Sequence, residues 1–201
     1  YLSDICRQCM QDLRVGFPEK STFNIELPSP GPAVNGNADQ IKQVIRSVVT
    51  NAREALDVDH GAVSCRLFTV HGRDIPEEQC YPLEFQPEVI DYACIEVMDN
   101  GCGKSEADVE RIFDPFFSTK FIGRGLGLSI ALGAVKAHGG CITVEVRPDH
   151  GTALRIYFPI SEEPVQQVGG QGEESATSLK GVSVLLVEDE VMVRRAAAAM
   201  L

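Results

Sequence analysis

The sequence predicts an α/β fold, and three observations support this class. Helix-like and strand-like patterns alternate along the chain rather than forming separate blocks. The hydrophobic fraction of 44% is typical of a packed soluble protein and argues against global disorder. A length of 201 residues allows one domain of ordinary size and a remnant, and is too short for two domains of average length.

The first helix and first strand are predicted near the N-terminus. Within residues 2–14 the apolar side chains fall at i, i+3, i+4, i+7, i+8 and i+11, which is one face of a helix. Gly16 and Pro18 end this helix. Residues 23–27 then alternate like a strand, and the prolines from Pro28 onward interrupt it.

The clearest helix follows Asn37 or Asp39, either of which can cap it. Residues 41–56 carry a continuous apolar stripe. At 100° per residue, Asn51 and Ser47 fall at one edge of that stripe. An amide at the border of a buried face is well placed to reach into a pocket beside the core.

The rest of the chain is predicted to hold two more strands, a further helix and a hairpin. Gly139-Gly140 stops the helix. The predicted ranges are strands over 62–70 and 92–98, a long loop over 72–89 between them, a helix over 125–138, and a hairpin of strands over 141–146 and 153–158. We therefore expect a domain over 1–160, a flexible Gly- and Glu-rich linker over 161–180, and a separate short segment over 181–201.

Charge and hydropathy exclude several classes of partner. With 18 basic and 29 acidic residues the net charge is −11, which argues against nucleic acid and anionic membranes. No apolar run approaches the roughly 18 residues that span a bilayer. Residues 1–4 lack the basic and apolar regions of a signal peptide, so we expect a cytoplasmic protein without direct membrane contact.

The seven cysteines are expected to be reduced thiols, because their number is odd and their spacing scattered. Cys65, Cys94 and Cys141 lie inside apolar strand-like runs, where cysteine behaves as a small hydrophobe. Cys6-x-x-Cys9 has no second pair at a suitable spacing, so no zinc site is expected.

A loop rich in acid and glycine follows the predicted strand over 92–98. In Asp99-Asn100-Gly101-Cys102-Gly103 the glycines allow backbone to approach a ligand closely, and the carboxylate can accept a hydrogen bond from an exocyclic amine such as that of adenine. A plain tight turn is the alternative. The loop is not a P-loop, since that motif needs glycine where the chain has Met98.

A second glycine-rich segment, over 123–128, opens onto the predicted helix. Converging backbone N–H groups and the helix N-terminus make it a candidate phosphate seat, with a simple glycine hinge as the alternative. Its spacing does not match the dinucleotide fingerprint. Between the two loops, the Phe-rich stretch 112–120 is interpreted as a lid with apolar anchors, leaving Lys120 able to reach a phosphate.

In this combination and order, residues 39–159 resemble the catalytic, ATP-binding domain of sensor histidine kinases, which is of the Bergerat type. The resemblance rests on four motifs and a late Gly151-Thr152. The matching segments are 39–56 for the N box, 99–103 for the G1 box, 113–120 for the F box and 123–128 for the G2 box. It implies a two-layer α/β sandwich, a mixed sheet with helices on one face.

The resemblance also implies roles for matching positions. Asn51 would coordinate the Mg²⁺ of Mg-ATP, and Asp99 would bind the adenine amine. The other positions implied to bind the nucleotide are Gly101, Gly103, Lys120, Gly125, Leu126, Gly127 and Thr152. Catalysis would consist of positioning and charge neutralisation, not of covalent chemistry by this domain.

Three positions depart from the family pattern. Ser47 replaces a second asparagine and also the glutamate that activates water in related ATPases, which favours a kinase. Lys104 follows the G1 box, and Arg124 lies in the G2 box. An ATPase of the same superfamily and a nucleotide-free pseudokinase docking module remain as alternative functions.

The expected partners are a phosphoacceptor hairpin and a response-regulator receiver. No histidine of this chain has the helical context of a phosphoacceptor, because His60, His71, His138 and His150 all lie near turns. The hairpin is therefore expected to precede Tyr1. Residues 184–190 resemble the first strand of a receiver, in which Glu188 and Asp189 would hold Mg²⁺. The chain is then interpreted as part of a hybrid kinase.

Overall fold

The computed structural model describes residues 1–18, 20–56, 61–76, 80–103, 105–117, 125–147 and 151–162. They belong to one compact unit that ends at Val165. Most of the expected linker and the receiver-like segment with Glu188 and Asp189 lie outside the described residues. Within the described ranges, no helix combines the length and apolarity needed to cross a bilayer.

Six strands of the described chain form one sheet in the order β1-β2-β4-β6-β5-β3. β1 runs parallel to β2, and the other neighbouring strands are antiparallel, so the sheet is mixed as predicted. The strands are β1 (Thr22–Glu26), β2 (Ala62–His71), β3 (Cys80–Tyr81), β4 (Asp91–Asp99), β5 (Cys141–Arg147) and β6 (Gly151–Pro159).

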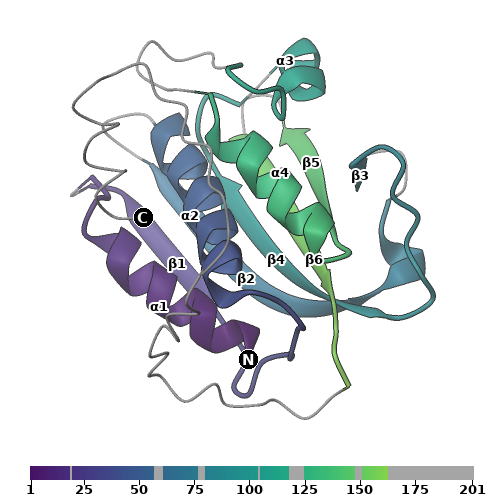
Figure 1. Cartoon of the computed structure of the whole chain (residues 1–201). Helices are drawn as coiled ribbons and strands as arrows, with labels where there is room; N and C mark the ends of the chain where they lie inside the picture. The colour runs from purple at the N-terminus through teal and green to yellow at the C-terminus, as the bar shows by residue number, and fades with distance from the viewer. Residues whose placement is uncertain are drawn as a thin grey trace, which may run out of the picture. The chain divides into compact units, whose positions relative to one another are not determined.

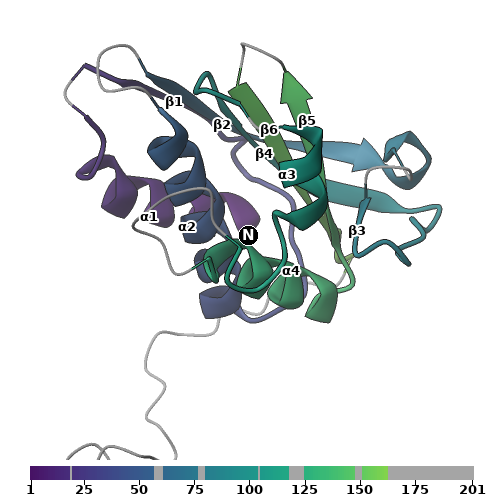
Figure 2. The same cartoon turned by 90° about the horizontal axis from the view of Figure 1, so that it is seen from above.

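Three helices cover one face of this sheet, which confirms the predicted two-layer α/β sandwich (Figures 1 and 2). They are α1 (Leu2–Arg14), α2 (Ala38–Ala55) and α4 (Gly127–Ala137). α2 lies between the other two and packs against both. The N-cap of α2 is Asn37, whose side chain accepts hydrogen bonds from the backbone N–H groups of Asp39 and Gln40 at 2.9 and 3.1 Å.

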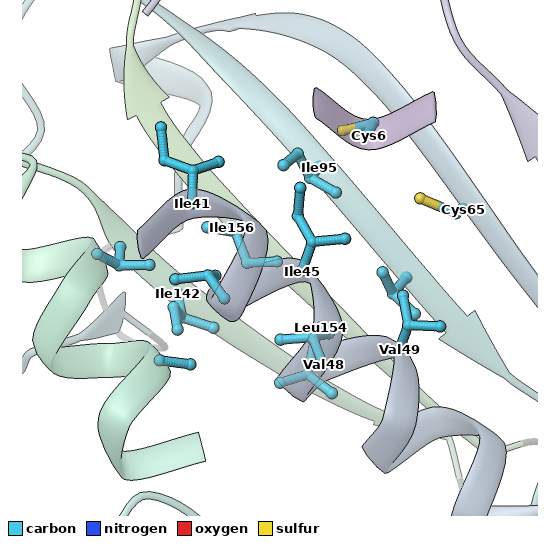
Figure 3. Packing of buried hydrophobic residues seen from close by; sticks show 14 of the residues in the cluster. Cys6, Ile41, Ile45, Val48, Val49, Cys65, Ile95, Ile142, Leu154 and Ile156 are labelled. Carbon is cyan, nitrogen blue, oxygen red and sulfur yellow. The ribbon is translucent and has the colours of Figure 1, made fainter. Parts of the chain in front are cut away.

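The core lies between α2 and the central strands (Figure 3). The apolar stripe predicted for α2 is buried at Ile41, Val44, Ile45, Val48, Val49 and Ala52. It meets the inward-facing residues of β4 and β6, which alternate with residues on the other face. This packing fixes the rotation of α2 and therefore the direction in which the polar edge of the helix faces.

The connection between β2 and β4 is more ordered than predicted. The expected loop over 72–89 contains a 3₁₀ turn, η1 (Gly72–Asp74), and the two-residue strand β3. Two residues are too few to show a period of two in sequence. β3 pairs with β5. Its Cys80 belongs to a smaller cluster on the face of the sheet away from the helices, whereas its Tyr81 packs against the main core.

A short helix, α3 (Glu106–Arg111), was not predicted. Ser105 and Asp108 form its capping box: Ser105 Oγ accepts from the Asp108 N–H at 3.1 Å, and Asp108 Oδ2 accepts from the Ser105 N–H at 3.4 Å. The spacing S-x-x-D was a usable signal for this helix start. α4 begins two residues later than predicted, because Gly125 has a left-handed φ of 60°.

Candidate functional site

The candidate site is built at one end of the sandwich, where β4 and β6 meet the helix layer. Asn51 lies one turn before the C-terminal end of α2 and is half-buried. Its Nδ2 atom is buried and has no hydrogen-bond partner among the described residues. Ser47, one turn earlier, faces the same side of the helix. The amide therefore has hydrogen-bonding capacity that the described protein does not use.

Asp99 ends β4 and is 5% exposed. Its Oδ1 accepts a hydrogen bond of 3.0 Å from the Gly101 N–H, which holds the turn that follows the strand. The turn is also tied to β2, since Asn100 Oδ1 accepts from the Ala62 N–H at 2.6 Å. The carboxylate is thus held in place by the backbone around it.

Gly101 brings this turn onto the end of α2. A Cβ at this position would collide with the backbone carbonyl of Ala55, so a side chain there requires the backbone to move. The Cys102 N–H donates to the same carbonyl oxygen at 3.4 Å. Because Ala55 lies one helical turn beyond Asn51, the G1-like loop and the Asn51 amide belong to neighbouring parts of the same end of the molecule.

Thr152 joins this end of the molecule from β6. The β4–β6 register pairs Met98 with Ala153, and its continuation by one residue sets Asp99 opposite Thr152. Facing residues in an antiparallel pair point to the same side, here the side covered by the helices. Thr152 is 2% exposed, and its Oγ1 has no hydrogen-bond partner among the described residues.

Gly151 completes the contact between β6 and the loop after β4. It has φ 89°, and an added Cβ would collide with the Asp99 carbonyl. From the sequence, Gly151 was expected only as part of a late Gly-Thr pair. The signal that it is a close-approach glycine is its position at the end of the predicted hairpin turn.

The N-terminus of α4 approaches α2 beside Ser47. A Cβ added at Gly127 would lie 3.8 Å from Ser47 Oγ, so the first turn of α4 and the polar edge of α2 are neighbours. Leu126 at the N-cap provides no side-chain hydrogen bond to this turn. The backbone N–H groups at a helix start carry partial positive charge and suit an anion.

The Phe-rich stretch is anchored at one end. Phe113 is buried, and its ring packs against Tyr81 of β3 with centroids 4.7 Å apart. Phe116, by contrast, is 77% exposed and has φ 68°, and its N–H donates to the Gly125 carbonyl at 2.9 Å. The predicted apolar anchor is therefore Phe113. Lys120 lies outside the described residues.

Tyr81 is a supporting residue that was not predicted from the sequence. Besides its contact with Phe113, its hydroxyl donates to the Val109 carbonyl at 3.4 Å, so β3 supports α3 and the start of the Phe-rich stretch. No local pattern pointed to it, because the contact spans 28 residues and depends on the pairing of β3 with β5.

The histidines inside the described ranges bind backbone. His138 Nε2 accepts from the Asn37 N–H at 3.0 Å, and its Nδ1 lies 2.7 Å from the Ala134 carbonyl oxygen. His71 accepts from the Arg73 N–H at 3.3 Å. These contacts give both rings a structural role. His60 and His150 lie outside the described residues.

Taken together, the predicted positions Asn51, Asp99, Gly101, Gly127 and Thr152 converge from four different elements on one end of the sandwich. Gly125 and Leu126 lead directly into α4, and Gly103, with φ 70°, ends the loop after β4. The arrangement combines a held carboxylate, two buried polar groups with spare capacity and a helix N-terminus. It suits a ligand that has a hydrogen-bonding base at one end and negative charge at the other.

Comparison with known proteins identifies the family. The model for histidine kinase-, DNA gyrase B- and HSP90-like ATPases matches residues 36–162. The chain is 36% identical over 172 residues to the sensor kinase CckA of Brucella abortus, covering 80% of this chain and 18% of that protein. It is 35% identical over 130 residues to the sensory histidine kinase/phosphatase NtrB of Vibrio alginolyticus, covering 64% of this chain and 34% of that protein. The chain therefore spans about a third of NtrB and less than a fifth of CckA.

Solved structures agree with the fold. The nucleotide-free catalytic domain of the histidine kinase ThkA has a TM-score of 0.58 and 26% identity, with 78% of this chain and 91% of that chain covered. The mycobacterial sensor histidine kinase MprB has a TM-score of 0.61 at 21% identity, over 78% of this chain and 94% of that chain. This chain belongs to the family of histidine kinase-, DNA gyrase B- and HSP90-like ATPases, and it is a catalytic ATP-binding domain of the histidine kinase type.

Proposed function

We propose that this domain binds Mg-ATP and supplies the γ-phosphoryl group to a histidine on a dimerisation hairpin, for relay to a receiver aspartate. The observation that carries the proposal is the convergence of Asp99, Thr152 and Asn51 at the end of a domain of this family. In this proposal Asp99 accepts from the adenine amine, and Thr152 Oγ1 gains a partner in the adenine pocket. Gly101 and Gly103 let the base approach the backbone.

At the other end of the ligand, the N-terminus of α4 receives the phosphates. Gly125, Leu126 and Gly127 present backbone N–H groups there, and Lys120 adds a cation from the adjoining stretch. Ser47, beside Gly127, offers a hydroxyl where the family carries a second asparagine.

The donor set fits a magnesium ion that is held mainly by the nucleotide. Within the described residues no group of three or more His, Cys, Asp or Glu side chains is placed to hold a metal. Mg²⁺ bound to a triphosphate needs only one or two protein oxygens, and Asn51 Oδ1 would supply one, while the buried Nδ2 of the same amide could donate to the nucleotide. The ion would neutralise triphosphate charge, and the protein's own part is to hold the nucleotide in place and limit access of water.

The proposed setting is a hybrid kinase. The chain spans only part of the sensor kinases to which it is similar, and residues 184–190 resemble the first strand of a receiver. The partners are then the phosphoacceptor hairpin of the parent protein and a receiver in which Glu188 and Asp189 bind Mg²⁺. The parent activity is that of a two-component histidine kinase.

Calorimetric titration with ATP, with and without Mg²⁺, tests the nucleotide proposal. We expect saturable binding that Mg²⁺ strengthens, and Asn51→Ala should remove most of the strengthening by Mg²⁺. Asn24→Ala, at an exposed position of β1, is the matched control and should bind as the parent chain does. Absence of both heat and thermal shift at millimolar Mg-ATP would contradict the proposal and favour a docking module.

Radiolabelled ATP tests the assignment of the phosphoacceptor to another segment. The chain should bind the nucleotide without becoming labelled, since none of its histidines is proposed as acceptor. Label retained on the chain after denaturation would overturn this part. Glu54 of α2 lies on the same edge of the helix as Ser47 and Asn51. Steady multiple-turnover release of phosphate that Glu54→Ala reduces would instead support a dedicated ATPase.

A further inference from the structure

The face of the sheet away from the helices carries a pair of buried cysteines in contact. Cys80 on β3 and Cys141 on β5 have Sγ atoms 3.5 Å apart, and both side chains are almost fully buried. They belong to the outer-face cluster, which consists of Ile75, Cys80, Tyr92, Cys94, Cys141 and Tyr157. This cluster lies on the opposite face of the sheet from the candidate nucleotide site.

Strand register explains why these two thiols meet. Cys80 pairs with Thr143, and Cys141 is two residues before Thr143 on the same face of β5. Diagonal neighbours of this kind lie within reach of each other's side chains. A disulfide needs the two sulfurs at about 2.05 Å, so a small rearrangement of the two-residue strand β3 would bring them together.

The third cysteine of the cluster is excluded from this pairing. Cys94 and Cys141 both pair with Tyr157, one from β4 and one from β5, so β6 lies between them. Two strand spacings amount to about 9.6 Å, which exceeds the Cα separation that a disulfide tolerates.

We propose that Cys80 and Cys141 form a redox-modification site, oxidised by a low-molecular-weight disulfide to an intramolecular bond that joins β3 to β5. The thiolate of Cys80 attacks the reagent and releases one thiol, leaving a mixed disulfide. The thiolate of Cys141 then attacks Cys80 Sγ and releases the second thiol. The protein loses two electrons and two protons, and the reagent is reduced to two thiols.

Cys80 reacts first because of its place in the fold. β3 is the edge strand of the sheet and is only two residues long, so its local opening needs little of the fold to move. Cys141 lies within a seven-residue strand paired on both sides, and contact with Cys80 together with burial raises the pKa of its thiol. β3 also carries Tyr81, whose side chain contacts Val109 of α3 and Phe113. The disulfide would therefore fix these contacts relative to the sheet.

The experiment uses the full chain with Cys102→Ser, because Cys102 is the exposed member of the seven cysteines and would otherwise react. The protein is incubated with oxidised glutathione, and its mass and thiol content are followed. We expect the loss of two hydrogens without an adduct, and full reversal by dithiothreitol. The proposal would be overturned if the incubated protein kept its original mass and still showed all six remaining thiols after unfolding. The same result in urea concentrations below the unfolding transition would show that access of the reagent is not the cause.

Peptide mapping identifies the bond without any further variant. Cleavage by trypsin together with a glutamate-specific protease separates the Cys80 peptide, 79–84, from the Cys94 peptide, 89–96. We expect the Cys80 peptide to be joined to the peptide of Cys141. A bond that includes Cys94, or one between two chains, would contradict the assignment.

Variants and thermal unfolding give a second readout. Cys80→Ser and Cys141→Ser should each abolish the two-hydrogen loss, while Cys94→Ser, the matched control in the same cluster, should retain it. Closing a loop between residues 61 apart restricts the unfolded chain, so the oxidised form should melt about 5–10 °C higher than the reduced form. A lower melting temperature on oxidation would show that the disulfide distorts the fold, and it would refute the proposal that the fold places these two cysteines for oxidation.

Discussion

Two acidic residues on the same strand show how differently this molecule treats buried charge. Glu96 and Asp99 of β4 are 2% and 5% exposed, and being three residues apart they face opposite sides of the sheet. Glu96 accepts hydrogen bonds from Arg66 Nε at 2.9 Å and Arg155 Nε at 2.7 Å. Asp99 instead accepts a hydrogen bond from the Gly101 N–H and lies opposite Thr152.

The difference separates a structural charge from a charge arranged for a ligand. Two guanidinium groups satisfy Glu96, and their hydrogen bonds lower the pKa of its carboxyl below the ordinary value although burial acts in the opposite direction. Around Asp99 the protein places glycines in close approach and leaves Thr152 Oγ1 without a partner among the described residues. Buried polar atoms of this kind are costly unless a ligand completes them.

Asp99→Asn should have the largest effect on function. The amide oxygen can still accept the Gly101 N–H, but the amide group no longer offers a charged acceptor to the base. ATP affinity should fall about 100-fold, as expected for a lost hydrogen bond to a charged group. Calorimetry measures the affinity, and a melting curve close to that of the parent chain shows that the fold is kept. Unchanged affinity would remove Asp99 from the site.

Glu96→Gln should have the opposite profile. It removes the charge that Arg66 and Arg155 share, so the free energy of unfolding should fall by about 1.5–3 kcal/mol. ATP affinity should stay the same, because Glu96 faces away from the candidate site. Urea denaturation and calorimetry measure the two quantities. A loss of affinity without a loss of stability would reverse the roles assigned to the two carboxylates.

Acid should weaken the stabilisation by Glu96 in a defined direction. Because the pKa of Glu96 is lower in the folded state than in the unfolded state, its contribution is present above about pH 4.3, the ordinary glutamate value. It disappears as the pH falls through the folded-state value. The difference in unfolding free energy between the parent chain and Glu96→Gln should therefore shrink below about pH 4.3. A difference that grows in acid would contradict this assignment.

Gly133→Ala should give the smallest effect. Gly133 lies in α4, and a Cβ there would meet nothing within 4 Å, in contrast to Gly101 at the candidate site. Replacement of a helical glycine by alanine should stabilise the protein by about 0.5–1 kcal/mol without changing ATP affinity. Chemical denaturation detects the gain, and a destabilised variant would indicate that α4 needs the glycine for a contact outside the described residues.

Local patterns predicted the order and type of most elements because helix and strand periods are properties of short segments. Residues 2–14 and 41–56 showed a helical period, and α1 and α2 cover nearly the same ranges. The elements that were missed are α3, η1 and β3. They have six, three and two residues, which is too short for a period to emerge. The resemblance to histidine kinases implied a two-layer α/β sandwich. The family match and the likeness to solved structures confirm it.

The sequence by itself determined which side chains lie on the polar edge of α2 and where the chain must turn on glycine, since both follow from bonding within a few residues. Only the tertiary structure decided that Asp99 on β4 lies opposite Thr152 on the neighbouring strand β6, and that Cys80 contacts Cys141, 61 residues away in the sequence. The physical reason is that strand pairing and register are selected by burial of whole faces of the sheet, a quantity to which distant segments contribute together.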